Sequence, residues 1–249
     1  MIILKDCREL QLMRESGKIA AGAIEKASQV IRPGVTTYAV DKALREYIES
    51  KGAKPSFLGL YGFPGSACIS INEELIHGIP SKRRVINEGD IVSIDIGALW
   101  KGFHSDTAYT FAAGAISENA KRLLETTQEC LRRGIEQAVV GNRIVDISRA
   151  VEEYATTQGY SVVREYEGHG VGRSLHEEPS VPNFVSARPG PRLCQGMTIA
   201  IEPMINEGSA KIKVLDDDWT VVTADNRLCA HFEHTVAITN NGPEILTAL

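Results

Sequence analysis

The sequence predicts an α/β (α+β) fold in which helices cover an antiparallel sheet and the two halves of the chain are similar. Two observations predict this class. Helix-like and strand-like segments occur in the same order twice, and a single ungapped offset of 107 residues relates the two series. No polar or proline-rich linker lies between the halves, so we expect one domain over residues 1–249, with an internal repeat at about 1–115 and 116–249.

The elements of the first half follow from apolar periodicity and from their end signals. The periodicity predicts helices at about 8–31 and 37–52 and strands near 66–71, 91–97 and 103–112. Pro33 and Gly34 end the first helix. Thr36 or Thr37 caps the second helix, which ends at Gly52.

The second half repeats this order. The expected elements are helices at about 117–139 and 145–159 and strands near 160–166, 197–203, 219–223 and 230–238. The offset carries Glu46 onto Glu153 within a helix, and Asp95 onto Glu202 within a distant strand. Any two amphipathic helices look alike, but one offset that also links two acidic strands favours a duplication. A duplicated half predicts a pseudo-twofold fold with one acid from each half near the axis.

Composition excludes several classes of protein. The chain is 43% hydrophobic and 24% charged, which is typical of a soluble globular protein. Its net charge of −5 argues against a nucleic-acid binder, and it has neither a secretory signal pattern nor an apolar run long enough to cross a membrane. The five cysteines form no Cys-x-x-Cys pair, which favours a reducing compartment. We therefore expect a cytoplasmic monomer with no nucleic-acid or membrane partner.

Two aspartates lie in segments with the pattern of buried strands. Asp95 ends one apolar run, and Asp106 follows a turn at 99–102. Folded symmetrically about Trp100 and Lys101, this hairpin would place Asp95 directly opposite Asp106, where like charges are destabilising. Lys101 is poorly placed in the turn to compensate them, so we expect a metal cation between the two acids.

Two glutamates present the same problem in the second half. Glu202 closes the apolar strand at 197–203, and Glu233 lies inside the strand at 229–238. A salt bridge to a nearby Arg or Lys would explain a single acid of this kind. Four such acids, two of them related by the offset, favour a metal site instead.

Three of the six histidines lie in segments with the pattern of loops. His169 stands between glycines, which would leave its backbone free to turn, His176 follows seven residues later, and His77 precedes a Gly and a Pro. Any one of them alone would more often be an ordinary surface or core residue. Carboxylates with one imidazole suit Mn, Fe(II), Co or Zn, and the absence of a His-Glu-x-x-His motif excludes the common one-zinc protease helix.

Taken together, five segments resemble the methionine aminopeptidases of the short, type I bacterial form, and they occur in that family's order. The segments are Phe63–Pro80, Gly89–Asp95, Gly168–Pro179, Ala200–Pro203 and Glu233–Thr235. The resemblance covers essentially the whole chain. It implies a pita-bread fold with one catalytic domain, and an enzyme that excises the N-terminal methionine from nascent polypeptides and peptides with a small second residue.

The resemblance also implies the metal ligands. Asp95 would hold one divalent ion, Asp106 and Glu233 would bridge two, and His169 and Glu202 would complete the second site. A water or hydroxide that bridges the two metals would be the nucleophile, as in other two-metal aminopeptidase sites. Which of cobalt, iron, manganese or zinc is used stays open.

Three residues receive catalytic roles from the resemblance. Glu202 would also act as the proton shuttle between the water and the leaving amine. His176 would donate a hydrogen bond to the scissile carbonyl, and His77 would contact the substrate beside the leaving nitrogen. Neither of these two histidines would be a metal ligand.

The methionine side chain would occupy an apolar pocket lined by Phe63, Cys68 and Trp219, with His77 nearby. The alternatives are an ordinary buried thiol for Cys68 and a surface aromatic on a hairpin for Trp219. Leu60 and Leu175 depart from the bacterial pattern, which has Tyr and Phe there, but both remain apolar. We expect the preference for methionine to persist and the shape of the pocket to differ.

Two other functions stay open at this point. One is an Xaa-Pro aminopeptidase or prolidase-like hydrolase, which shares the ligand pattern but usually has a further N-terminal domain that we do not expect here. The other is a non-catalytic pita-bread binding protein, which would typically lack some of the ligands that this chain keeps. A contact with the ribosome near its exit tunnel is a further possible partner that the sequence does not decide.

Overall fold

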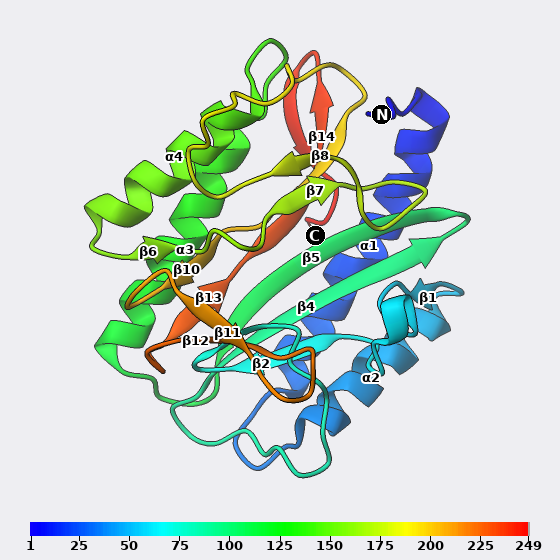
Figure 1. The fold of residues 1–249 in the computed structure, drawn as a ribbon. Coiled ribbons are helices and arrows are strands. Elements are labelled where there is room, and N and C mark those ends of the chain that lie inside the picture. Colours follow the sequence, from blue (N-terminus) through cyan, green and yellow to red (C-terminus); the bar gives the residue numbers. More distant parts are fainter. Residues whose placement is uncertain (249) are drawn as a thin grey trace.

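The computed structural model describes residues 1–248, in which one curved antiparallel sheet is flanked by four helices (Figure 1). The helices are α1 (Cys7–Val30), α2 (Thr37–Ser50), α3 (Glu118–Glu136) and α4 (Ile144–Thr157). Their first turns are capped as the sequence suggests: Asp6 and Glu9 form a capping box on α1, and Thr36 caps α2. The predicted helices are all present, and α2 shifted by 107 residues has the bounds of α4.

The main sheet has nine strands. Its path is β1 (Lys54–Pro55), β4 (Ile91–Trp100), β5 (Phe103–Ala112), β14 (Glu233–Thr239), β9 (Thr198–Ile201), β7 (Gly168–Gly170) and β8 (Glu177–Val181), with β2 (Cys68–Ile71) on β4 and β15 (Gly242–Ile245) on β14. Strands β5 and β14 join the two halves, because Glu233 pairs with Ala108 and His234 with Thr107.

Two small sheets complete the strand structure. One contains β13 (Cys229–His231), β10 (Met204–Asn206) and β6 (Ser161–Val162), and the other contains β11 (Ile212–Val214), β12 (Val221–Thr223) and β3 (Glu74–Ile76). A single 3-10 turn covers Leu60–Gly62.

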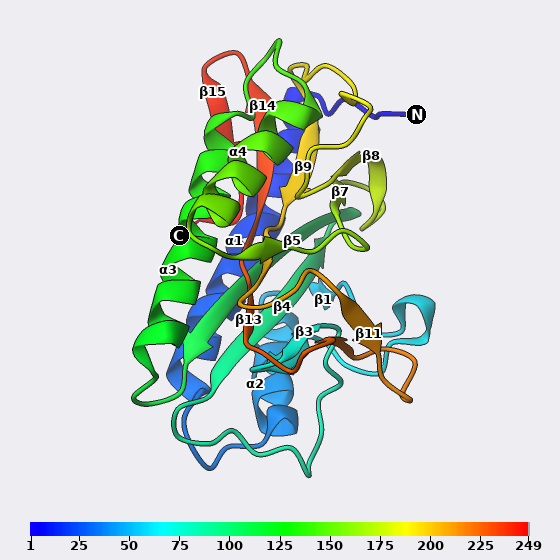
Figure 2. The same cartoon turned by 60° about the vertical axis from the view of Figure 1, so that its left-hand side comes forward.

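The helices and the small strands lie on opposite sides of the main sheet. Figure 2 shows α1, α3 and α4 on one side and β7, β8 and β11 on the other. Each half has its own apolar cluster: α1 and α2 pack on β2 and β4, while α3 and α4 pack on β9 and β14. Burial of one sheet face by helices leaves the opposite face to form the candidate site. Within residues 1–248 no helix is both long and apolar enough to span a bilayer.

Several predicted strands differ from the observed ones. The strand expected at 230–238 is broken at Phe232, so that His231 lies in a small sheet and Glu233 in the main sheet. The strand expected at 197–203 ends at Ile201, and Glu202 stands in the break before β10. The strand expected at 160–166 is reduced to two residues. Because these segments carry apolar runs, periodicity alone did not show where the chain changes sheet.

Candidate metal and substrate site

The hairpin of β4 and β5 carries the two aspartates, but not in the predicted register. Asp95 lies opposite Ala108, and Asp106 lies opposite Gly97. The prediction that the two acids face each other directly was wrong, because the turn is centred on Lys101 and Gly102 rather than on Trp100 and Lys101. Lys101 and Gly102 have φ values of 47° and 85°, as a two-residue hairpin turn requires. Asp95 and Asp106 are therefore diagonal neighbours on one face of the sheet.

The two glutamates come from the second half and are held where strands break or meet. Glu233 is the first residue of β14, directly beside β5. Glu202 follows β9, and its backbone carbonyl accepts a hydrogen bond from Asn183 Nδ2 at 2.9 Å. Asp95 and Glu202 thus enter the site from positions related by the 107-residue offset.

His169 lies among these carboxylates. Its Nε2 is 3.7 Å from Asp106 Oδ2 and 3.7 Å from Glu202 Oε1, and ligand atoms of Asp106, His169 and Glu233 all lie within 4.8 Å of one another. His169 Nδ1 is 2.8 Å from the carbonyl of Gly170, which can only accept, so Nδ1 carries the proton and Nε2 presents its lone pair to the acids. This is the tautomer that a metal ligand needs.

Gly168 and Gly170, on either side of His169, were expected to leave the backbone free to turn, but they have a different structural role. His169 is in β7 and not in a loop. A Cβ on Gly168 would lie 2.3 Å from the carbonyl of Ala200, and one on Gly170 would lie 2.2 Å from that of Glu178. These glycines allow close approach of neighbouring strands, which brings the imidazole to the acids.

The charges of the four carboxylates are not compensated by cationic side chains. Asp106 and Glu233 are 4% and 2% exposed, and within the part of the chain that the structure describes the ion pairs of the cluster are with histidines alone. Asp95 Oδ1 and Glu233 Oε1 are buried without a hydrogen-bond partner. Buried carboxylates with free lone pairs and a nearby imidazole lone pair fit a divalent cation.

Burial raises the pKa of every carboxyl in the cluster. The pKa of Asp95 is raised to about 7 and that of Glu202 to about 8, first by burial and in addition by the negative charges of Glu202 and Glu167 respectively. The pKa values of Asp106 and Glu233 are raised well above their usual range by burial and then by the neighbouring acids. The pKa of His169 is lowered to about 4 by burial, so that its imidazole is neutral. Bound cations would favour the ionised carboxylates.

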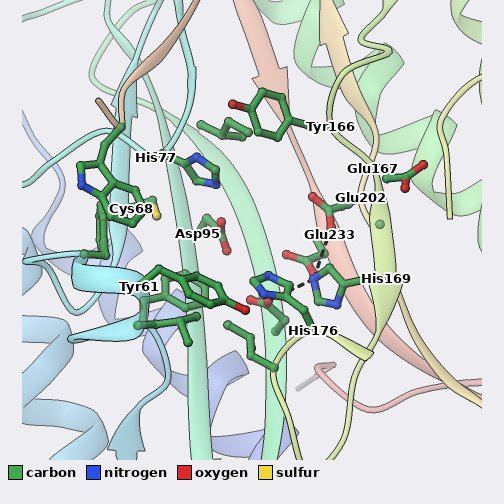
Figure 3. A pocket seen from close by; sticks show the side chains of 18 of the residues that line it. Tyr61, Cys68, His77, Asp95, Tyr166, Glu167, His169, His176, Glu202 and Glu233 are labelled. Carbon is green, nitrogen blue, oxygen red and sulfur yellow. Dashed lines mark ion pairs between the residues drawn. The ribbon is translucent and has the colours of Figure 1, made fainter. Parts of the chain in front are cut away.

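A cavity of about 360 Å³ opens beside this cluster (Figure 3). Asp95, Glu202, Glu233 and His169 line one part of it, and the predicted pocket residues Phe63, Cys68, His77, His176 and Trp219 line the rest. Cys68 is 4% exposed and pairs with Asp95 across β2 and β4, so the thiol stands next to the acids. The rings of Phe63 and Trp219 meet edge to face at 5.1 Å. One wall of the cavity is thus apolar and the other is acidic.

The two remaining histidines reach the cavity from opposite sides. The ring centroid of His176 is 4.4 Å from that of His169, whereas His77 is 5.5 Å from Tyr166 and 6.3 Å from Trp219. His77 adopts a φ of 60°, a strained conformation for a non-glycine residue. The sequence indicated both residues, and the structure brings them to one cavity.

Several lining residues carried too little signal in the sequence. Phe57, Ile76, Tyr61, Tyr166, Glu167 and Ser180 also line the cavity, as do Leu60 and Leu175, which were predicted from the sequence to change the shape of the pocket. Tyr61 is 78% exposed at a φ of 50°, and its ring is parallel to that of His176 at 6.1 Å. Glycines at 59 and 62 mark an unusual turn there, but not the direction of the side chain. His231, discussed below, was hidden inside an apparently continuous strand.

Comparison with known proteins agrees with this geometry. A family model described as "Metallopeptidase family M24" matches residues 11–240. The chain belongs to metallopeptidase family M24. It is 53% identical to a methionine aminopeptidase of Clostridium perfringens over 100% of both chains, and 51% identical to methionine aminopeptidase 1 of Bacillus subtilis over 99% of both.

Solved structures of the M24 family show the same fold. A methionine aminopeptidase from Thermotoga maritima aligns with a TM-score of 0.98 at 43% identity over 100% of both chains. A prolidase from Pyrococcus furiosus aligns with a TM-score of 0.82 at 27% identity, over 99% of this chain and 66% of the prolidase. The predicted pita-bread fold and the predicted family are confirmed.

Proposed function

We propose that this M24 chain is a metal-dependent aminopeptidase that removes the N-terminal methionine from nascent proteins and from peptides with a small second residue. One observation carries the proposal: the uncompensated acid cluster and an apolar pocket share one cavity. A substrate whose side chain fills the pocket would have its first peptide bond beside the acids. The close relatives named methionine aminopeptidase support the same reaction.

The proposed metal sites use the five ligands of the cluster. Asp95 would hold one ion, Asp106 and Glu233 would contact two, and His169 with Glu202 would hold the other. Buried oxygens of Asp95 and Glu233 without protein partners support this assignment. Divalent ions bound there would act as Lewis acids and lower the pKa of a water molecule. Cobalt, iron(II), manganese and zinc all suit this donor set.

The remaining chemistry is proposed for the side chains of this protein. Glu202 takes a proton from the attacking water and passes it toward the leaving amine. His176 donates a hydrogen bond to the scissile carbonyl oxygen as negative charge develops on it. His77 contacts the substrate beside the leaving nitrogen. Phe63, Cys68 and Trp219 exclude water from the methionine side chain.

A prolidase-like activity is the alternative within the same family, and a non-catalytic binding role is the alternative outside enzymes. The apolar pocket lined by Phe63 and Trp219 favours methionine over the first. The complete set of five candidate ligands in one cluster favours catalysis over the second.

A peptide assay tests the proposal. Metal-free protein would be loaded anaerobically with Mn, Fe(II), Co or Zn, with bound metal counted by mass spectrometry. We expect two ions per chain and release of methionine from Met-Gly and Met-Ala peptides but not from Met-Leu. Robust cleavage of Gly-Pro peptides, with no release of methionine, would show that the assignment is wrong.

The setting of the reaction is also a proposal. Nascent chains carry their first methionine in the cytoplasm, where the free cysteines of this chain would stay reduced. We expect a monomer that acts on nascent polypeptides, and sedimentation with and without ribosomes would test both the oligomeric state and a ribosome contact.

A further inference from the structure

A fourth histidine lies beside the acid cluster. His231 is the last residue of β13, is 1% exposed, and directly precedes Phe232, where the chain breaks before β14. Its backbone N–H donates to Thr110 Oγ1 at 3.1 Å, and its carbonyl accepts from the same hydroxyl at 2.8 Å. His231 also pairs with Met204 on β10. The main chain therefore fixes where this imidazole stands.

The imidazole of His231 stands between acids from the two halves. Its Nε2 is 3.5 Å from Glu202 Oε2, and it is close enough to Asp95 that each affects the charge state of the other. Glu202 Oε1 faces His169, so each oxygen of this carboxylate faces a different imidazole. In His169, Nδ1 donates to the Gly170 carbonyl and Nε2 points toward the proposed metal site. In His231, neither nitrogen has a hydrogen-bond partner in the described chain.

A simple packing role does not explain this residue. Burying an imidazole without hydrogen bonds costs more than burying an apolar side chain of the same size. His234, three residues later, is also largely buried, but its Nδ1 lies 2.9 Å from Thr247 Oγ1. The fold thus provides a partner for one histidine of this segment and directs the other to Glu202.

We propose that His231 is a positioning residue for Glu202: when a cation is bound, the Nε2–H of His231 would close from the present 3.5 Å to hydrogen-bond distance of Glu202 Oε2, and so hold Oε1 toward His169 and the metal-binding acids. A neutral imidazole carries one N–H, so it can make this donation without adding a positive charge to the site. The donation would strengthen when a cation ionises Glu202, because hydrogen bonds to a charged acceptor are stronger. This proposal rests on the proposed function for the metal site and for the role of Glu202 as a base.

Two variants at position 231 separate positioning from packing. His231→Leu removes the donor and keeps an apolar volume, whereas His231→Gln keeps a neutral N–H donor. We expect His231→Leu to lower kcat on a Met-Ala-Ser peptide by about 10- to 100-fold with KM changed less than about 2-fold, and to weaken the first Mn(II) Kd by about 10-fold, the usual scale for groups that orient a metal ligand. His231→Gln should recover most of both losses.

His234→Leu is the matched control, since it removes an imidazole from the same strand segment without touching Glu202. It should lower Tm but leave kcat and the Mn(II) Kd within about 2-fold. The proposal fails if His231→Leu keeps both values, if His231→Gln behaves like His231→Leu, or if His234→Leu loses as much. Should His231→Leu not fold, His231→Asn, whose shorter amide places the donor away from Glu202, is expected to show the same loss.

Calorimetric titration of metal-free protein with Mn(II) reads the positioning role without turnover. If wild-type protein releases no methionine, the proposed function fails, while a weaker Mn(II) Kd in His231→Leu that His231→Gln restores would still support the contact with Glu202.

Discussion

A buried carboxylate, Glu177, and the buried acid cluster of the candidate site differ in how their negative charge is balanced. Glu177 is paired with Lys5 at 2.5 Å, and the two side chains are 6% and 2% exposed. Glu177 also accepts from the Ser174 backbone N–H, and Lys5 Nζ also donates to the Ile3 carbonyl. Among residues 1–248, no such lysine or arginine pairs with the acid cluster of Asp95, Asp106, Glu202 and Glu233.

The difference shows what the cluster is for. Lys5 neutralises the buried carboxylate of Glu177, which directly follows His176 in the sequence. At the cluster the fold leaves four acids without such a cation and raises their pKa values instead. Such a cluster is destabilising unless a cation is supplied from outside. The pair stabilises the start of β8, directly after His176, whereas the cluster is prepared to bind a cation.

The largest expected effect comes from removing one charge of the cluster. Asp106→Asn should abolish methionine release, by about 10³-fold or more, and reduce the bound metal, because a carboxylate proposed to contact both ions becomes neutral. The same change should raise the Tm of the metal-free protein by relieving repulsion. Metal counting and scanning calorimetry check both results. Full activity with two ions bound would contradict the proposed site.

The opposite outcome is expected at the balanced pair. Lys5→Met leaves Glu177 buried without a cation and should lower the free energy of unfolding by about 3–5 kcal/mol. Adding Glu177→Leu should recover most of this loss, since an apolar pair of similar volume avoids the buried charge. Urea unfolding of the two variants measures the effect. Equal stability of Lys5→Met and wild type would show that the pair contributes nothing.

His176 connects the two groups, because it precedes Glu177 and its ring contacts His169. His176→Ala should lower kcat by about 10²-fold while metals still bind, the scale for losing a donor to a developing oxyanion. Steady-state kinetics and metal counting on the same sample test this. Loss of metal in this variant would mean that His176 belongs to the ligand set.

The sequence predicted the strands of the first half of the chain better than those of the second half. Strands β4 and β5 have ten residues each, long enough for their bounds to be found within a few residues. The short strands β7 and β10 have three residues each, too few to show a period, and their partners are distant in the sequence. The four helices carried both periodicity and capping residues, and these were predicted closely.

The site shows the same division. The residue types and their order indicated the acids and the three histidines, and the resemblance to a family supplied their roles. Which residues pair across the hairpin depends on the turn at Lys101 and Gly102. A shift of this turn by one residue from its predicted position made Asp95 and Asp106 diagonal neighbours instead of a directly opposed pair. His231 could not be assigned, because its direction depends on a change of sheet at Phe232 that a continuous apolar run conceals.

The smallest expected effect is a dependence of stability on pH that only the unbalanced group should cause. The folded pKa values of Asp95 and Glu202, about 7 and about 8, lie above those of unfolded carboxyls. The folded metal-free state therefore holds more protons than the unfolded state, and its stability falls as pH rises. The six histidines, whose pKa values burial lowers (those of His169 and His77 to about 4), have the opposite effect, which is half lost at about pH 6.5 and nearly gone above about pH 7.5.

Between pH 7.5 and 8.5 the buried acids dominate, and metal-free protein should lose about 1 kcal/mol of unfolding free energy. Urea unfolding across this range measures the slope, with Asp106→Asn expected to reduce it. Protein loaded with Mn(II) should show little slope, because the bound cations neutralise the ionised acids at every pH in this window. The prediction would be contradicted if the unfolding free energy fell steeply with pH in the Mn(II)-loaded protein and stayed constant in the metal-free protein.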